Sequence, residues 1–410
     1  MNPKSIPDEA ILQVASQINQ RSNKAYPIPI VGHAENPETP QIFEILPFDQ
    51  IDNTDVTFFA IDGSYNSQEF YNGLCVAMYT AGYVAYRGGV QLRLNDLDDP
   101  IILGKSYAPS KMLITHESHK AEIYDELLTL EPVKAFLTFL ESPVESIFAY
   151  NRDTICSSTS TLLGFAQEIL EWSLVHEIGV SAITKSGDFI LRDGTLRSLH
   201  IKQQYLVKLG HFLHDKGIRL LAVTKNSPIK LELAYTFKQI DSYLQDKLKP
   251  NYTFKTTDPA RQKLCCWFEV PDAVLAAAYS GKLYVRKETT GGRGCGLFFA
   301  ARLDYVEKLQ NYDWLVVDVN LYDAIPGIDK KNLTRDAQTL VALFLNLTRL
   351  TQEHYILGYP YPLVEAHNFV SIKKEFKDEV VKRVKFALYH EQQMDNVDIE
   401  NLFLDIHDRF

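Results

Sequence analysis

The sequence predicts a mixed α/β fold, and three patterns along the chain carry this prediction. Between residues 158 and 225, segments with helical apolar spacing alternate with short apolar segments typical of strands. Residues 262–320 are rich in strand-type runs, and the segments at 334–350 and near 368–390 have helical spacing. Alternating helices and strands are typical of α/β architecture, so we expect a mixed sheet flanked by helices.

Each expected element has a local reason. Pro132 interrupts a helical pattern, because proline lacks the N–H that a helix interior needs. Ser158 is a capping residue for the next helix, and Gly179 and Gly217 are expected to end helices. The expected elements are helices at 8–20, 119–141, 158–179, 198–217, 334–350 and near 368–390, and strands at 57–62, 74–86, 91–97, 100–107, 188–194, 218–225 and within 262–320.

Length and composition set the domain organisation. At 410 residues the chain exceeds the usual size of one hydrophobic core, so one enlarged domain or two modest ones are expected. No internal repeat and no low-complexity linker separates two domains. We therefore expect residues 1–55 to form an N-terminal arm with one helix, residues 56–390 to form one domain, and residues 391–410 to form an acidic tail.

Charge and cysteine content exclude several classes of protein. The net charge of −10 argues against a nucleic-acid binder that uses its whole surface, although a local basic groove is compatible with it. No apolar run is long enough for a membrane span, and the first residues do not read as a secretory signal. The five cysteines contain no Cys-x-x-Cys pair, which argues against a disulfide framework. These features predict a cytoplasmic protein that does not enter a membrane.

Two Asp-Gly pairs follow apolar strands in matching contexts. Asp62 precedes Gly63 after one expected strand, and Asp193 precedes Gly194 after another. A carboxylate at a strand end lies at the rim of a sheet, where it can bind a hard divalent cation. Taken singly, each pair is explained better by an ordinary turn. Taken together, they predict a shared site.

The helix between the two pairs supplies further carboxylates. Glu168 and Glu171 lie three residues apart, hence on neighbouring parts of one helix face. Glu171 and Glu177 differ in direction by about 120° around a helix, so only one of them can face a given cation. The residues alone leave open which of Glu168, Glu171 and Glu177 points inward.

Five segments resemble the NurA family of nucleases, in the same order along the chain. They are FFAIDGSYN (58–66), LEW (170–172), FILRDGTL (189–196), AVTKNS (222–227) and GYPYPLVEAHNFV (358–370). The resemblance spans roughly residues 56–390 and implies a ribonuclease H-like mixed sheet flanked by helices. The stretches near 90–145 and 245–300 have no matching motif, so we expect them to be insertions, the second one rich in strands.

The resemblance also implies the site residues. It makes Asp62, Glu171, Asp193 and His367 the metal ligands, and Tyr359 a catalytic residue beside them. Glu171 directly precedes Trp172 in the matched LEW segment, and Glu177 is the alternative for the helical acid. The implied cofactor is manganese, as one ion or two, with magnesium as a weaker substitute. The alternative for His367 is a buried histidine hydrogen-bonded within the last helices.

The implied activity is a deoxyribonuclease of the 5′–3′ exonuclease and single-strand endonuclease type. The implied partners are DNA, a HerA-type hexameric ATPase that translocates DNA in end resection and repair, and a second copy of the chain in a homodimer. The alternative function is a catalytically inactive DNA-binding or regulatory partner of the same ATPase. Loss of cleavage on removing the Asp62 carboxylate would distinguish the two.

Basic residues that could contact DNA are concentrated in one part of the sequence. Between residues 191 and 230 there are eight basic residues and two acidic ones, in a chain whose net charge is negative. Phosphate contacts dominate affinity for nucleic acids, so a basic strip beside the cation site would suffice. We expect DNA contacts at Lys225 and Arg197, and at Arg293 in the Gly-rich turn at 291–296.

Overall fold

The computed structural model describes residues 7–26, 43–44, 56–70, 73–92, 105–107, 113–114, 117–248, 265–279, 295–304, 314–330, 332–352 and 358–404. It confirms a mixed α/β protein in which mostly antiparallel strands are flanked by helices. The chain forms two compact units, where the sequence had suggested one domain at 56–390. Unit 1 comprises residues 1–53, 194–197 and 220–361, and unit 2 comprises residues 54–193, 198–219 and 362–410.

The sheet of unit 2 contains one parallel pairing among antiparallel ones. Its strand order is β7-β2-β3-β4, and β5 and β6 also pair with β3. β2 pairs with β3 in antiparallel fashion and with β7 in parallel fashion. The strands are β2 (Thr57–Glu69), β3 (Cys75–Arg87), β4 (Val90–Leu92), β5 (Lys105–Tyr107), β6 (Leu113–Ile114) and β7 (Phe189–Asp193).

β2 and β3 pair with each other, and both continue past the positions where the sequence predicted an end or a break. The first strand was expected to stop at Asp62 and the second to break at Gly82, but both run through these positions, and Asp62 is paired with Gly82. The expectation of a turn at Asp62-Gly63 was therefore wrong. The glycines are accommodated because a strand tolerates a residue without a side chain where another element approaches closely.

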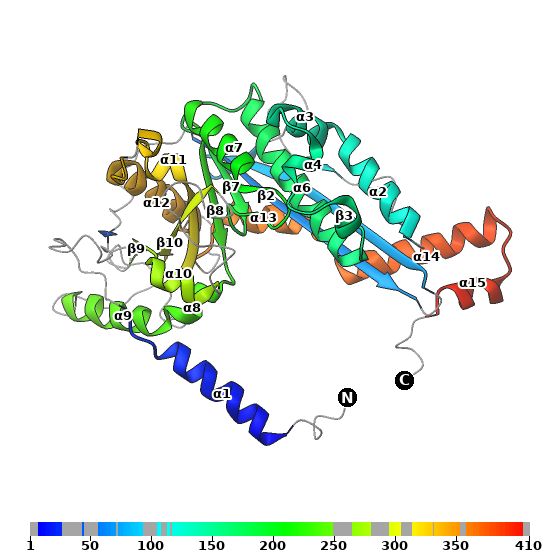
Figure 1. Ribbon diagram of the computed structural model, residues 1–410, viewed down its shortest axis with the longest axis horizontal. Helices are drawn as coiled ribbons and strands as arrows, with labels where there is room; N and C mark the ends of the chain where they lie inside the picture. The colour runs from blue at the N-terminus through cyan, green and yellow to red at the C-terminus, as the bar shows by residue number, and fades with distance from the viewer. Residues whose placement is uncertain are drawn as a thin grey trace. The chain divides into compact units, whose positions relative to one another are not determined.

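Helix α6 (Thr159–Val180) covers β2 and β3, as Figure 1 shows. Its first turn is capped as predicted, because the Ser158 hydroxyl accepts the N–H of Thr161. Gly179 does not end the helix, since α6 continues to Val180. A Cβ atom on Gly179 would lie 2.5 Å from Leu213 Cδ2, so this glycine permits close packing against α7 (Gln203–Asp215).

The other helices of unit 2 follow the predicted pattern with shifted boundaries. The segment at 119–141 is indeed interrupted before Pro132, and the last helical segment is divided in two. The helices are α2 (Glu117–Thr129), α3 (Glu131–Leu140), α4 (Val144–Ile147), α5 (Arg152–Ile155), α13 (Tyr361–Val370), α14 (Lys374–His390) and α15 (Asn396–Leu402).

Part of the expected acidic tail is a packed element. Ile399 in α15 and the following Phe403 are buried in a cluster with Phe70, Val76 and Val381. The Phe403 ring meets the Phe70 ring edge-on, with 5.0 Å between centroids. Residues 396–403 therefore belong to the core of unit 2.

Unit 1 contains an antiparallel sheet with the strand order β1-β9-β10-β11-β8. Its strands are β1 (Phe43–Glu44), β8 (Arg219–Thr224), β9 (Cys266–Glu269), β10 (Gly296–Arg302) and β11 (Trp314–Asn320). Its helices are α1 (Asp8–Ser22), α8 (Pro228–Glu232), α9 (Ala234–Leu248), α10 (Asp272–Ala278), α11 (Leu321–Ala324) and α12 (Ala337–Gln352), with a 3-10 turn η6 (Ile328–Lys330). The strand expected at 282–287 lies outside the described residues.

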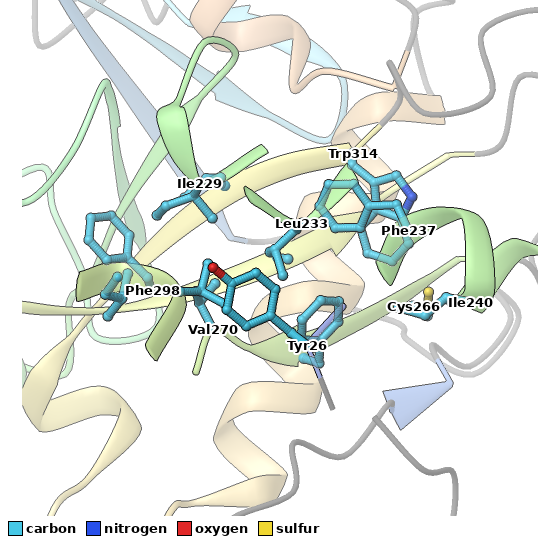
Figure 2. Close-up of a cluster of buried hydrophobic side chains, with 14 residues drawn as sticks. Tyr26, Ile229, Leu233, Phe237, Ile240, Cys266, Val270, Phe298 and Trp314 are labelled. Carbon is cyan, nitrogen blue, oxygen red and sulfur yellow. The ribbon is translucent and has the colours of Figure 1, made fainter. Parts of the chain in front are cut away.

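Figure 2 shows the aromatic core of unit 1. The Phe237 ring stacks on Trp314 with 4.4 Å between centroids. Tyr26 belongs to the same buried cluster, and its hydroxyl donates to the Glu232 carboxylate. The end of the expected arm is thus part of this core.

The described residues also bear on the predictions about membrane spans and disulfide bonds. None of their helices is long and apolar enough to cross a lipid bilayer. The five cysteines are all described, all are buried, and none of them forms a disulfide bond.

Candidate active site

Asp62 lies in the middle of β2 and is 7% exposed. Its Oδ1 accepts the N–H of Gly63 at 2.8 Å, and its Oδ2 lies 2.9 Å from Nδ1 of His367 in α13. Burial raises the pKa of the Asp62 carboxyl, and the negative charge of Glu171 raises it further, whereas the hydrogen bond with His367 opposes the shift. Asp62 is thus a buried carboxyl whose negative charge is only partly offset.

Gly63 brings α6 close to this carboxyl. A Cβ atom at Gly63 would lie 2.6 Å from Gln167 Cγ and 2.6 Å from Glu171 Oε1. The Gln167 amide also donates to the Gly63 carbonyl at 3.0 Å. The glycine is therefore required by the close approach of α6 and not by a turn.

Glu171 is the acid of α6 that approaches Asp62, and its side chain is 2% exposed. Gln167 donates to Glu171 Oε1 at 2.8 Å, and Arg192 Nη2 donates to Oε2 at 2.5 Å. Burial raises the pKa of Glu171, and Arg192 counteracts part of this increase. Glu177, the alternative, lies six residues further along α6, about 120° around the helix.

Asp193 ends the strand next to Asp62. In the parallel pairing of β2 with β7, Ile61 is opposite Arg192, and Asp62 and Asp193 are the next residues on the two strands. Neighbouring strands lie ~4.8 Å apart, so the two backbones are adjacent. Asp193 is half-buried, and Gly194 follows it with a φ of +111°, which is the turn predicted there.

The pleat of the sheet divides these residues between its two faces. Successive side chains of a strand point to opposite faces, and the Gly63 position faces α6. Arg192 and Glu171 meet on that same face, whereas Asp62 and Asp193 alternate with Gly63 and Arg192 and so leave the sheet on the other face. His367 meets Asp62 there, and its side chain is 54% exposed.

The donor types on the Asp62 face fit a divalent cation. Two carboxylates and one imidazole suit manganese, and a cation would offset the charge that burial makes unfavourable at Asp62. Glu171 fits by charge more than by contact, because it lies on the other face of the sheet, where Gln167 and Arg192 donate to its two oxygens. Among the described residues, no three His, Cys, Asp or Glu side chains are gathered as a group that could hold a metal ion.

Tyr359 and Lys225 form a pair within unit 1. Tyr359 is 4% exposed, and its hydroxyl donates to the Val223 carbonyl in β8. The Lys225 ammonium lies 4.0 Å from the centroid of the Tyr359 ring, and Lys225 is exposed. The buried Tyr359 ring therefore packs against the exposed Lys225 ammonium, just after the end of β8.

Arg197 has a structural position inside unit 1. Its Nη1 donates to Asp318 Oδ2 at 2.5 Å, its Nη2 donates to the Gly296 carbonyl, and its guanidinium stacks on Phe298. The side chain is 8% exposed, so we do not retain Arg197 as a DNA contact. Arg293, the third expected contact, lies outside the described residues.

The basic strip at 191–230 is weaker at the surface than the sequence suggests. Arg192 and Arg197 are both buried in ion pairs, with Glu171 and Asp318 respectively. Sequence counting treats every arginine as exposed, and it therefore overstated the basic charge available to a phosphate backbone.

The sequence analysis did not identify Gln167 and Arg192 as the hydrogen-bond donors to Glu171. The four-residue spacing of Gln167 and Glu171 was a readable sign that they share a helix face. Arg192 follows three apolar residues in a strand that is buried up to that position, which was the only local sign that this arginine is enclosed.

Comparison with known proteins found no matching family model and no matching curated protein.

Proposed function

We propose that this protein is a divalent-metal-dependent deoxyribonuclease that hydrolyses DNA phosphodiester bonds. The observation that carries the proposal is the contact of Asp62 with His367, which are far apart in the sequence, with the Glu171 carboxylate nearby on the other face of the sheet. Asp193, on the neighbouring strand, completes a set of carboxylates that suits phosphoryl chemistry.

The residues have separate roles in this proposal. Asp62, Asp193 and His367 would hold manganese, which lowers the pKa of a bound water and stabilises charge on the leaving oxygen. Asp62 orients the imidazole through Nδ1, so that Nε2 is the ring nitrogen directed to a cation or to a proton transfer. Glu171 adds negative charge behind Asp62.

The resemblance to NurA nucleases supports the finer features of the proposal. The mixed sheet of unit 2 is compatible with a ribonuclease H-like core. The proposed activity is of the 5′–3′ exonuclease and single-strand endonuclease type. The proposed setting is DNA end resection by a homodimer with a HerA-type hexameric translocase, and Lys225 is the proposed phosphate contact.

The test is degradation of single- and double-stranded DNA with manganese by the wild-type chain, Asp62→Asn and Asp188→Asn. Asp62→Asn should reduce cleavage on the order of 100-fold or more, because stabilisation of the leaving oxygen is worth several kcal/mol. Asp188 is the matched control, a buried aspartate of the same unit that accepts backbone N–H groups of Thr57 and Lys185. Its variant should lose stability and keep its cleavage per folded molecule.

Two outcomes would contradict the proposal. Cleavage that survives Asp62→Asn unchanged would come from a contaminating nuclease. A wild-type chain that binds DNA and does not cut it with manganese would instead be the inactive DNA-binding partner of the ATPase.

A further inference from the structure

Arg192 is a buried cation shared by several carboxylates. The residue is 7% exposed, and its guanidinium donates to Glu171 and lies 5.1 Å from the centre of the Trp172 ring. Burial alone would lower the pKa of Arg192, but the negative charges of Glu171, Glu168 and Asp193 raise it overall. One guanidinium thus interacts electrostatically with three carboxylates.

The carboxylates around Arg192 come from two elements. Glu168 and Glu171 belong to α6, and Asp193 follows Arg192 in β7. Glu168 is 13% exposed, accepts the N–H of Leu199, and lies 3.7 Å from the His200 ring. Glu171 therefore pairs directly with Arg192, and the negative charges of Glu168 and Asp193 act on it electrostatically. Burial makes uncompensated charge unfavourable in this region.

We propose that Arg192 is a positioning residue that limits the affinity of the proposed site for a divalent cation. While no cation is bound, it holds the Glu171 carboxylate against Gly63 and offsets the surrounding negative charge. Its own positive charge opposes the arrival of a cation at Asp62 and Asp193, and so sets a limit on cation affinity. This inference rests on the proposed function, because it concerns the cation of that site.

The position of Arg192 distinguishes this role from an ordinary internal ion pair. Arg192 is paired in register with Ile61, directly before Asp62, and directly precedes Asp193. The guanidinium lies on the opposite face of the sheet from the proposed ligands, so it acts on a cation through space and not by contact. Charges within several ångströms interact strongly where solvent is excluded.

The test is manganese binding to the full chain, measured by isothermal titration calorimetry without DNA. Arg192→Gln should bind manganese on the order of tenfold more tightly than the wild-type chain, because one nearby positive charge is removed. Arg192→Lys keeps the charge and should stay within about twofold of the wild-type affinity, although lysine makes a single point contact.

Arg197→Gln is the matched control. Arg197 is buried to the same degree and donates at the same distance, 2.5 Å, to Asp318 of unit 1. Its variant should lose stability in the same way and leave manganese affinity unchanged. A purely structural role for Arg192 would give the two variants the same behaviour.

The outcomes separate this inference from the proposed function. If the wild-type chain binds manganese and Arg192→Gln binds it equally or more weakly, this inference is wrong and the nuclease proposal stands. If neither binds manganese, both are wrong. If Arg192→Gln does not fold without metal, manganese should restore its cooperative thermal transition and should not restore that of Arg197→Gln; failure of this rescue would overturn the inference.

Discussion

At the scale of single residues, Gly63 has the most consequences. The absence of a side chain lets Gln167 and Glu171 of α6 approach the backbone beside Asp62. This contact brings a second carboxylate close enough to raise the pKa of Asp62. The same Asp-Gly sequence at 193–194 makes a turn, since Gly194 has a φ of +111°. Identical dipeptides thus serve different purposes in this chain.

Gly63→Ala should destabilise unit 2 and weaken cleavage. The new methyl group would lie 2.6 Å from Glu171 Oε1, so α6 must shift, at a cost of about 1–3 kcal/mol. Gly164→Ala in the same helix meets nothing within 4 Å and should stabilise the protein by up to ~1 kcal/mol. Urea unfolding of both variants gives the comparison. If Gly63→Ala and Gly164→Ala had equal free energies of unfolding, α6 would not be closely packed against Gly63 of β2.

At the scale of elements, α6 is joined to its neighbours by an aromatic cluster around His176. This histidine is 5% exposed, and its ring centroid lies 4.7 Å from that of Phe139 and 6.3 Å from that of Phe212. Its Nδ1 has no hydrogen-bond partner among the residues that the structure describes. Burial, with a contribution from Lys216, lowers the pKa of His176 to about 4.

His176→Phe should reduce the sensitivity of the protein to mild acid. The unfolded chain takes up a proton on His176 near pH 6.5, and the folded chain does so only near pH 4, so the wild-type free energy of unfolding falls as pH decreases through this window. Phenylalanine suits the aromatic surroundings and does not titrate. The part of the acid sensitivity due to His200, whose pKa burial also lowers, should remain. Urea unfolding at pH 7 and pH 5 measures the effect, and equal losses in both proteins would refute it.

The sequence analysis placed the residues of α15 in an acidic tail, but α15 packs on the core of unit 2. Phe403→Ala should cost about 3–5 kcal/mol, because it removes a buried ring from the cluster with Phe70 and Val76. Val397→Ala is the control, since Val397 is 68% exposed and its truncation should change stability by less than ~0.5 kcal/mol. Chemical denaturation of the two variants checks this. A Phe403→Ala variant as stable as its control would place α15 outside the core.

At the scale of the whole molecule, the proposed function requires an acidic chain to bind DNA, which is an acidic polymer. The net charge is −10. Arg192 and Arg197 are buried in ion pairs, so these two positive side chains do not add to the surface charge. Under the proposed function, DNA affinity would depend on local exposed cations such as Lys225, whose ammonium lies over the buried Tyr359 ring. Affinity from phosphate contacts decreases steeply with salt.

Lys225→Gln should weaken DNA binding and reduce the slope of log affinity against log salt by about one. Lys208→Gln is the control, because the Lys208 ammonium lies 2.8 Å from the Glu141 carboxylate and is partly neutralised. Fluorescence anisotropy with labelled DNA at several salt concentrations separates the variants. If Lys225→Gln and Lys208→Gln lower the slope equally, Lys225 makes no specific phosphate contact and the change reflects the surface charge in general.

The sequence by itself determined the elements whose signals are local. The helix after Ser158 and the strand that ends at Asp193 follow from apolar periodicity and capping chemistry, which act within a few residues. The candidate acids were readable because an Asp-Gly pair after an apolar run is visible without its partners. Helix limits at Gly179 and the strand limit at Asp62 were wrong, because each glycine serves packing against another element.

Only the tertiary structure decided which of these residues meet. The contact of His367 with Asp62 spans 305 positions and that of Arg192 with Glu171 spans 21, and no local pattern encodes either. The burial of Arg192 and Arg197 likewise depends on carboxylates supplied by other elements. A charged side chain becomes buried only when folding brings it a partner, so its role is a property of the assembled fold.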